Sequence, residues 1–595
     1  NVYLVIFYPS FWEHIQTLFK IFFKEYQRMF LGTFILMIVQ AVGTLMIPYY
    51  VAEIIDEGIL TQDQGAIWRN GAFMLGIAVL TGIVSIIASY YSAILAGRFG
   101  YFLRKRLVDK TLRLSMADMD EFGTPTLLAR TTSDITNIQQ IMMMVFQMII
   151  PAPLICLASI VLTGAISWRF VWIPIVSIVL FSLVSLAVIK KAIPLADVMQ
   201  QRMDKMMQIL REFYTGVRVI RAFNKNNFEK KRTDKTFSNY AEVMIRVNKL
   251  FAVLNPTVNL VMGVGMTAVL AFGGVMVLQG SVPIGSLTAI SEYTILSLWF
   301  LTMAAMVIVM IPKALASLER IGEVLDTQEE IIDGSKAAFE LRENQPIAIF
   351  DHVDFAYSGA EEAVLSNITF DIPKGVTAIV GGTGSGKSTI AKALLRLRDT
   401  TKGEIRFHGE TIKNVTQESL RARISYVPQK AFLFSGTVKD NFLFGNPYAT
   451  EEEMKQAAKV AQAEDFIADL DGQFDAFVAQ KGNNFSGGQK QRLSIARALI
   501  KPADLYFFDD SFSALDYQTD AKLRKALKSY LAEAAIVIVA QRLSTIKDAD
   551  QIIVLEEGKI VGKGTHEELL RTCHVYQEFA KSQGMEGKKH EHQAS

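Results

Sequence analysis

A glycine-rich stretch in the second half of the chain has the residue types that bind a triphosphate. Residues 381–388 read Gly-Gly-Thr-Gly-Ser-Gly-Lys-Ser, after an apolar run and before a helical pattern. Glycines let backbone N–H groups converge on phosphate oxygens without obstruction by Cβ atoms. Lys387 adds a positive charge, and the Ser388 hydroxyl is a candidate Mg²⁺ ligand. This strand, loop and helix context predicts ATP binding by Gly382, Thr383, Gly384, Ser385, Gly386, Lys387, Ser388 and Thr389.

Three further residues are placed to serve the same site. Asp509 closes the apolar run 505–508, as when a buried strand delivers a carboxylate to a metal, although it could simply end that strand. Gln429 follows Tyr-Val-Pro and could bind Mg²⁺ or a water, or be a surface residue. Tyr357 could stack on adenine or merely fill a core. We expect ATP and Mg²⁺ as cofactors, with Ser388, Gln429 and Asp509 at the metal.

Composition predicts that the rest of the chain includes a membrane region. Of 595 residues, 51% are hydrophobic, which is too apolar for an ordinary soluble protein. The net charge of +2 gives no indication of a nucleic-acid partner. The two cysteines, Cys156 and Cys573, are placed where a disulfide is not expected, which favours a cytosolic soluble part.

Six apolar runs are each long enough to cross a bilayer core, which needs about 20 helical residues. A preceding segment, about residues 11–26, mixes bulky apolar and charged residues as interfacial helices do. The short apolar stretch at residues 2–7 lacks a basic lead-in and does not favour a signal peptide. The six expected spans are 30–51, 72–96, 138–167, 170–189, 251–278 and 284–311.

Loop charges predict the orientation of these spans. The segments after the second and fourth spans are rich in Lys and Arg, so these two segments belong inside the cell. The segment after the first span is acidic, so it belongs outside. These inner connections are about 40 and 60 residues long and mostly helical in pattern. We therefore expect a multi-pass plasma-membrane protein whose spans extend far into the cytoplasm.

The predicted order is a membrane α-helical domain followed by an α/β phosphate-loop nucleotide-binding domain. The helical pattern ends near residue 325, and alternating strand and helix patterns follow a polar stretch. The polar C-terminal end predicts disorder. The expected boundaries are a transmembrane domain at 1–320, a linker at 321–345, a cytoplasmic nucleotide-binding domain at 346–583 and a disordered tail at 584–595.

With these motifs in order, the chain resembles an ABC transporter, specifically an exporter-type half-transporter, over nearly its whole length. Residues 485–489, Phe-Ser-Gly-Gly-Gln, match the family's signature loop except for Phe485 in place of Leu, and residues 513–516 match its D-loop. The resemblance implies that two such domains meet head to tail. It also implies that the loops near 119–126 and 212–221 couple the membrane and nucleotide-binding domains. The ATP bound by the partner would be contacted by Ser486, Gly487, Gly488 and Gln489.

Two residues depart from the family's pattern at positions that serve hydrolysis. The family's efficient members have Glu and His where this chain has Asp510 and Gln541. Asp is one methylene shorter than Glu, and a displacement of about 1 Å can cost about 100-fold in rate. Gln cannot carry a proton as imidazole can. Either change alone could be neutral drift, but both beside an intact signature predict a slow site.

A slow site of this kind predicts a non-identical partner. A homodimer would have Asp510 and Gln541 at both ATP sites, whereas a second half-transporter could bring Glu and His to one of them. The arrangement resembles heterodimeric bacterial multidrug exporters, in which one subunit carries these substitutions. The chain's own site would then be degenerate, and its signature would complete the partner's competent site.

The membrane half offers candidate contacts for cargo. Glu292 is an acidic residue inside an apolar run, which marks a functional candidate or a structural pair between spans. Trp299, Phe300 and Met303 could line an adaptable apolar pocket, or face lipid and neighbouring helices. We expect export of amphipathic drugs, with membrane lipids as neighbours. The alternatives are a lipid or peptide exporter and a regulatory, ATP-sensing membrane subunit.

Overall fold

The chain forms two compact units. The first holds residues 1–114 and 119–328, and the second holds residues 115–118 and 329–595. The computed structural model describes residues 9–339, 345–357, 360 and 362–584. The segment 2–7 and residues 585–595 of the predicted tail lie outside the described residues. The domain boundaries expected from the sequence stay predictions.

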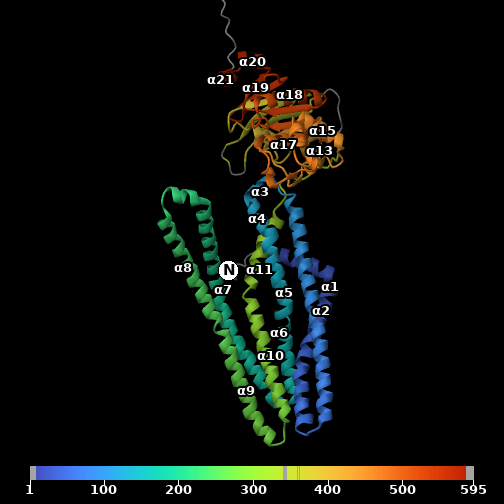
Figure 1. Cartoon of the computed structure of the whole chain (residues 1–595), viewed down its shortest axis with the longest axis vertical. Coiled ribbons are helices and arrows are strands. Elements are labelled where there is room, and N and C mark those ends of the chain that lie inside the picture. Colours follow the sequence, from blue (N-terminus) through green and yellow to red (C-terminus); the bar gives the residue numbers. More distant parts are fainter. Residues whose placement is uncertain (1–8, 340–344, 358–359, 361, 585–595) are drawn as a thin grey trace, which may run out of the picture. The chain divides into compact units, whose positions relative to one another are not determined.

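The first unit consists of helices (Figure 1). In the described part of the chain, six helical segments are long and apolar enough to cross a membrane, as predicted. A π-helical turn at Ile54–Ile59 ends the first segment, and two others interrupt the third segment at Arg130–Asp134 and Val145–Ile149. The helices are α1 (Pro9–Glu53), α2 (Gln64–Thr111), α3 (Met116–Phe122, of which residues 116–118 belong to the second unit), α4 (Thr124–Ala129), α5 (Ile135–Met144), α6 (Pro151–Ile166), α7 (Trp172–Ala222), α8 (Asn226–Phe251), α9 (Leu254–Leu278), α10 (Ile284–Ile308) and α11 (Ile311–Asp326).

Several of these helices are longer than a bilayer requires. Helix α7 has 51 residues and is therefore about 77 Å long at 1.5 Å per residue. A hydrocarbon core is only about 30 Å thick. Figure 1 shows α7 and α8 running side by side as a long antiparallel pair. The expectation that the spans extend far beyond the membrane is confirmed.

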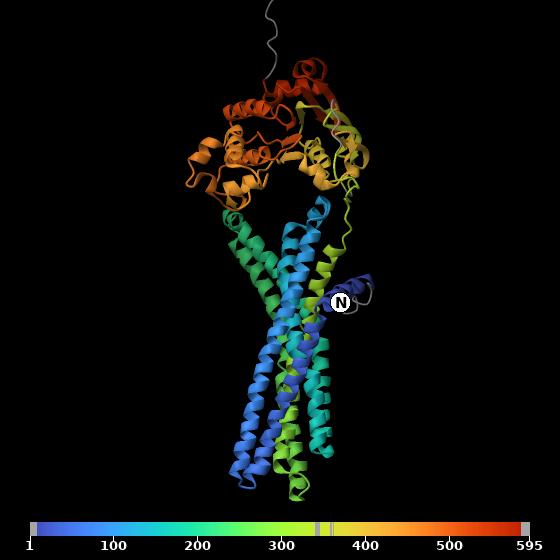
Figure 2. The same ribbon diagram turned by 90° about the vertical axis from the view of Figure 1, so that its right-hand side faces the viewer.

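The first helix bends near its start. Tyr26 has non-helical backbone angles (φ −111°, ψ 18°), and the preceding part of α1 turns away from the remainder, as Figure 2 shows. Phe22 in this part is fully buried, with its ring centroid 5.0 Å from that of Phe99 on α2. The bend falls where the predicted interfacial helix ends. Because Phe22 packs on α2, this segment is anchored by the protein itself; its location in a membrane interface stays a prediction.

An ion pair with a buried carboxylate joins α11 to the third membrane segment, Thr124–Ile166. Arg320 Nε donates to Asp134 Oδ2 at 2.9 Å, and Ser317 Oγ donates to Asp134 Oδ1 at 2.9 Å. The Asp134 side chain is only 7% exposed. A buried carboxylate needs such donors, because an unpaired charge is costly away from water. This contact connects two segments more than 180 residues apart.

The second unit is an α/β domain with three sheets. A six-stranded sheet has the order β12-β11-β3-β10-β9-β6, a four-stranded sheet has the order β2-β1-β4-β5, and β7 pairs with β8. The strands are β1 (Ala348–Phe355), β2 (Leu365–Ile372), β3 (Gly375–Gly381), β4 (Lys402–Phe407), β5 (Glu410–Thr411), β6 (Ile424–Val427), β7 (Gly436–Thr437), β8 (Phe477–Val478), β9 (Leu505–Asp509), β10 (Ala535–Val539), β11 (Gln551–Glu556) and β12 (Lys559–Gly564).

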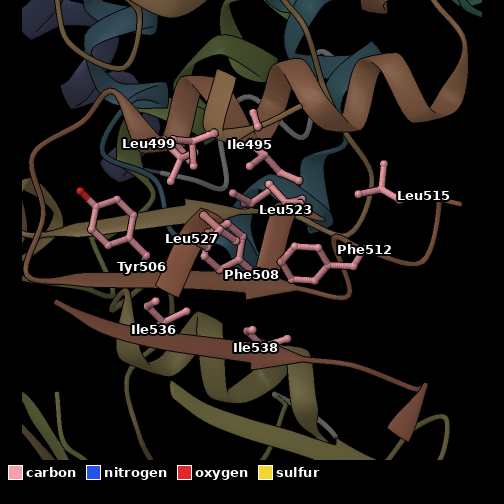
Figure 3. Close-up of a cluster of buried hydrophobic side chains, with 14 of the residues drawn as sticks. Ile495, Leu499, Tyr506, Phe508, Phe512, Leu515, Leu523, Leu527, Ile536 and Ile538 are labelled. Carbon is pink, nitrogen blue, oxygen red and sulfur yellow. The ribbon is translucent and has the colours of Figure 1, made fainter. Parts of the chain in front are cut away.

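Helices pack on the six-stranded sheet and enclose the main hydrophobic core of the unit. Figure 3 shows Leu523 and Leu527 of α18 near Phe508 of β9, with Ile536 and Ile538 on the adjacent strand β10. Strand β10 is apolar at every position, and β9 is apolar up to Asp509 at its end, because both faces of these strands are buried. The helices are α12 (Lys387–Leu394), α13 (Gln417–Ala422), α14 (Val438–Leu443), α15 (Glu451–Val460), α16 (Glu464–Ala468), α17 (Gly487–Leu499), α18 (Tyr517–Tyr530), α19 (Leu543–Ile546), α20 (His566–Thr572) and α21 (His574–Ser582).

The described part of the expected linker has its own contacts within the second unit. Gln417 donates its backbone N–H to Asp333 Oδ1 at 3.0 Å. Lys336 donates its backbone N–H to Asn414 O at 3.0 Å. Polar composition predicted a linker here, and backbone groups of this segment pair with the loop before α13. Residues 333–336 are therefore held on the domain.

The contact between α1 and α2 depends on Gly43. A Cβ at this position would lie 2.1 Å from Thr81 Oγ1, whereas a Cβ at Gly76 on α2 would meet nothing within 4 Å. We expect Gly43→Val to destabilise the protein by about 1–3 kcal/mol through overpacking. Thermal unfolding of the purified protein in detergent measures this, with Gly76→Val as the matched control. Equal melting temperatures for the two variants would contradict the packing argument.

Candidate nucleotide site

The candidate site forms where parallel strands end together. Strand β10 pairs in parallel with β3 and with β9, so that Val539 is level with Ile379 on one side and Asp509 on the other. Strand β6 pairs in parallel with β9 on its far side. The phosphate loop, Asp510, Gln541 and Gln429 all follow the carboxyl ends of these strands. Binding sites in parallel sheets form at this edge.

The phosphate loop runs from β3 into α12. Gly384 and Gly386 have positive φ angles of 83° and 96°, a conformation that glycine adopts without strain. Lys387 Nζ donates to the carbonyl oxygens of Gly381 and Gly382 at 2.8 and 2.6 Å. Burial lowers the pKa of Lys387, opposed by the nearby Asp510 and Asp509. The loop therefore combines backbone donors, a positive charge and a helix N-terminus, which suits a polyphosphate.

Asp509 occupies the position expected of a Mg²⁺ ligand. Ser388 Oγ donates to Asp509 Oδ1 at 3.1 Å, and the Tyr426 hydroxyl donates to Oδ2 at 3.2 Å. Burial raises the pKa of the Asp509 carboxyl, although both hydrogen bonds lower it. Among the described residues, no three His, Cys, Asp or Glu side chains gather as a metal site. Mg²⁺ usually takes one or two carboxylates with phosphate oxygens, so Asp509 and Ser388 fit it beside a bound triphosphate.

Asp510 is held by two carboxamides. Gln429 Nε2 and Gln541 Nε2 donate to the same oxygen, Asp510 Oδ2, at 3.1 and 3.0 Å. Burial raises the pKa of the Asp510 carboxyl, and these hydrogen bonds with the charge of Lys387 oppose the rise. The Asp510 backbone has φ of 48°, a sparsely populated region for a residue with a side chain. The structure therefore joins the two residues that depart from the family's pattern.

One pocket of about 360 Å³ collects most of the predicted nucleotide contacts. Tyr357 lines it, with the guanidinium of Arg398 lying 4.9 Å from the ring centroid. Gly382 does not line it but accepts a hydrogen bond from Lys387. Val364 and Val539 also line the pocket, although nothing in the sequence singled them out. The predicted residues in the lining are Tyr357, Thr383, Gly384, Ser385, Gly386, Lys387, Ser388, Thr389, Gln429, Asp509, Asp510 and Gln541.

The signature loop lies elsewhere in the unit and is absent from the lining of this pocket. Ser486 is the N-cap of α17, where its Oγ accepts from the Gln489 backbone N–H at 3.3 Å. Gln489 Oε1 accepts in return from the Ser486 N–H at 2.9 Å. A Cβ on Gly487 would meet nothing within 4 Å, and one on Gly488 would lie 3.4 Å from Ala514 O. The loop therefore presents a capped helix N-terminus with open space at its first glycine.

Family comparisons agree with the two-part fold and this site. Residues 29–301 match the family model of the ABC transporter transmembrane region, and residues 365–513 match a second family model described as ABC transporter. An ABC transporter ATP-binding protein of Mycobacterium tuberculosis is 36% identical over 566 residues, covering 94% of this chain and 97% of the relative. The chain belongs to the ABC transporter family. Its ATP-binding domain is therefore an ATPase coupled to transport, and the protein is a multi-pass membrane protein with a cytoplasmic nucleotide-binding domain.

Two other relatives and one structure narrow the class of ABC transporter. The ATP-dependent lipid A-core flippase of Alkalilimnicola ehrlichii is 30% identical and covers 92% of this chain and 93% of that relative. The probable multidrug resistance ABC transporter ATP-binding/permease protein YheI of Bacillus subtilis is 30% identical, with 94% and 95% covered. A bacterial Atm1-family ABC exporter with ATP bound has a TM-score of 0.79 at 25% identity, with 95% and 99% covered. The chain is an exporter-type half-transporter.

The membrane unit of this ABC transporter has a separate pocket of about 250 Å³. Trp299, Phe300 and Met303 line it together, and polar side chains including Gln40 and Gln147 face the same space. Glu292 does not line this pocket and is exposed on α10. The structure thus brings three of the four candidate cargo residues together and leaves the acidic one apart.

Gln583 holds the loop that follows β10 and contains Gln541, here called the switch loop, and the sequence did not predict this contact. Its Nε2 donates to Gln541 O at 2.8 Å, and its Oε1 accepts from the Leu543 N–H at 2.8 Å. One carboxamide therefore fixes the backbone on both sides of Arg542. No sequence signal points to it, because it lies 42 residues from Gln541 and the contact exists only in the folded domain.

The Asp509 geometry predicts a pH dependence of Mg²⁺ binding. A carboxylate must be ionised to bind Mg²⁺, and the raised pKa of Asp509 means that it takes up a proton at a higher pH than an ordinary Asp. We expect the Mg²⁺-dependent part of ATP affinity to fall as pH drops from about 7.5 to about 5. Titration with a fluorescent ATP analogue, with and without Mg²⁺, measures it. Asp509→Asn should lower the Mg²⁺ effect throughout and keep only the titration of ATP itself; a wild-type profile identical to that of the variant would exclude this role.

The Gln583 contact predicts local protection of the switch loop. Gln583→Ala removes two hydrogen bonds worth about 1 kcal/mol each, so amide exchange in residues 541–546 should accelerate about tenfold or more. Hydrogen–deuterium exchange measured by mass spectrometry tests this. Gln577→Ala is the matched control, because Gln577 lies on α21, which ends directly before Gln583, and it donates to Leu570 O instead. Unchanged exchange in Gln583→Ala would mean that other contacts hold the loop.

Proposed function

We propose that this chain is one subunit of a heterodimeric ABC exporter that moves amphipathic compounds, such as drugs, out across the plasma membrane. Its own ATP site, built on Lys387, Ser388 and Asp509, is proposed to hold nucleotide and hydrolyse it slowly. Its signature loop is proposed to complete the faster site of a non-identical partner. The observation that carries the proposal is the pairing of Asp510 with Gln541 in a chain whose signature loop is intact.

The chemistry around Asp510 supports a slow site. Fast hydrolysis needs a group that orients or deprotonates the attacking water at the right distance. The Asp510 carboxylate is one methylene short of the family's Glu, and one of its oxygens accepts from both Gln429 and Gln541. Neither amide takes up a proton near neutral pH. The Asp510 carboxylate thus accepts hydrogen bonds from two amide groups that cannot relay a proton.

The signature loop supports the second half of the proposal. Ser486, Gly487, Gly488 and Gln489 keep the residue types that bind phosphate at a helix N-terminus, and the reciprocal cap holds them in place. A subunit that only sensed ATP would have no use for a loop that completes another chain's hydrolytic site. This reasoning favours transport over the regulatory alternative.

The membrane pocket supports an amphipathic cargo. Trp299, Phe300 and Met303 give it apolar and polarisable surface, and amide and hydroxyl groups give it hydrogen-bonding capacity. Lipid export is the second candidate, because one relative is named as a lipid A-core flippase and another as a probable multidrug resistance transporter. Glu292, which lies outside the pocket, is proposed only as a contact for cationic cargo on the exposed side of α10.

Restoring the family's residues tests the slow site directly. In the purified chain without its partner, Asp510→Glu combined with Gln541→His should raise ATP turnover by about 100-fold, because both ATP sites of a self-paired assembly regain their catalytic groups. The measurement is steady-state phosphate release in lipid nanodiscs. Rapid turnover by the unaltered chain alone would refute the proposal.

The signature contribution is tested in the complex with the co-expressed partner. Ser486→Ala should abolish most ATPase activity and dye efflux, since it acts on the partner's faster site. Thr450→Ala is the matched control, because Thr450 closes the same kind of reciprocal cap with Glu453 on α15. Both variants lose about 1 kcal/mol of helix capping, so a similar loss of activity in the two would reduce Ser486 to a structural role.

A further inference from the structure

The nucleotide-binding domain contains a second and larger pocket that shares no lining residue with the ATP pocket. Its volume is about 590 Å³, against about 360 Å³ for the ATP pocket of this single chain. It lies between α18, α19 and the strands β3 and β10. Its size suits a small organic molecule.

The deep wall of this pocket is apolar. Ile536 and Ile538 on β10 and Leu527 on α18 line it, and they are three of the side chains labelled in Figure 3. All three belong to the main core of the domain and are at most 5% exposed. Val376 of β3 adds further apolar surface. A ligand must therefore offer an apolar body to this wall.

The rim of the pocket carries excess positive charge. Two of its cations already have acidic partners: Arg524 pairs with Asp520 at 3.2 Å, and Lys528 pairs with Asp550 at 3.5 Å. Lys525 and Lys547 also line the pocket, and neither has an ion-pair partner among the described residues. Asp548 is the one acidic residue in the lining. Two lysines are thus left to receive negative charge.

We propose that this pocket binds a small organic anion with an apolar, ring-sized body. The apolar wall takes the body, and Lys525 and Lys547 pair with the anionic groups at the rim. Such a division between buried apolar contact and a few charged contacts is what small-molecule sites generally use. The proposal concerns a site apart from the ATP pocket and does not depend on the heterodimer.

The position of the pocket gives this binding a consequence for the ATP site. Helix α18 begins directly after Asp516 of the D-loop, and α19 begins two residues after Gln541. Thr545 Oγ1 on α19 donates to Asp520 Oδ2 on α18 at 3.4 Å, and both side chains are buried. An anion in the pocket touches both helices at once. It therefore stabilises the arrangement of the two segments that carry the D-loop and the switch loop.

Pyranine, a membrane-impermeant pyrene trisulfonate, is a suitable probe. We expect saturable binding of one pyranine per chain by fluorescence anisotropy, using the full-length chain in neutral-lipid nanodiscs with saturating ATP and Mg²⁺ to occupy the nucleotide sites. Lys525→Glu combined with Lys547→Glu should weaken binding about tenfold or more, because attraction becomes repulsion. Lys522→Glu is the matched control: Lys522 is an exposed lysine on the same helix that does not line the pocket, and its variant should change affinity less than twofold.

A substitution that fills the pocket with a larger side chain gives a second and independent test. Ala521 lines the pocket and is exposed, so Ala521→Trp should block pyranine binding while leaving every charge in place. Unchanged thermal unfolding and ATP binding would show that each variant is folded. Absence of saturable pyranine binding to the unaltered chain would overturn the proposal, as would equal loss of binding in Lys522→Glu and in the double lysine variant. Displacement of pyranine by ATP would place the probe in the nucleotide pocket and also overturn it.

Discussion

The parallel register of β3, β10 and β9 is the constraint on which the nucleotide site depends. It places Ile379, Val539 and Asp509 level with one another, so the phosphate loop, the switch loop and two acidic residues leave the sheet at one edge. The strands are buried on both faces, and a slip of register by one residue would move each side chain to the opposite face and disrupt the packing of both cores. The core illustrated in Figure 3 therefore helps to fix the spacing of the groups at the carboxyl ends of these strands.

At that edge the domain keeps two adjacent carboxylates largely out of water, and it does so with different partners. Asp509 is paired with the hydroxyls of Ser388 and Tyr426, which leaves a geometry suited to a metal ion. Asp510 is paired with two amides, which satisfy its charge without offering a proton acceptor. Burial raises the pKa of both carboxyls. The two neighbouring acids thus differ in the groups that donate to them.

Much of the fold and of the nucleotide site could be predicted from the sequence, but side-chain contacts between distant segments could not. The six spans, their long extensions and the α/β domain follow from apolar run length and from strand, loop and helix order, and they are confirmed. The pocket around Lys387, Asp509 and Gln541 is also assembled largely as expected. Gln583 and the Asp134–Arg320 pair were not predicted, because each joins segments far apart in the chain through side chains with no periodic pattern. Glu292 was a candidate because of its apolar neighbours, but the sequence does not give the direction of its side chain, which is exposed and lies outside the pocket lined by Trp299, Phe300 and Met303.

A single chain of this fold carries the phosphate loop and the signature loop in one domain but does not bring them to one pocket. In an assembly that pairs such domains head to tail, each ATP site is built from two subunits, so a substitution in one subunit changes only that subunit's half of a site. Substitutions at Asp510 and Gln541 then affect one composite site, whereas changes at Ser486 affect the other. This separation explains how a chain can lose residues for fast hydrolysis while keeping a well-capped signature helix: under the heterodimer proposal the two features serve different ATP molecules. Gln583, which holds the backbone of the switch loop, would then act on the slower site alone.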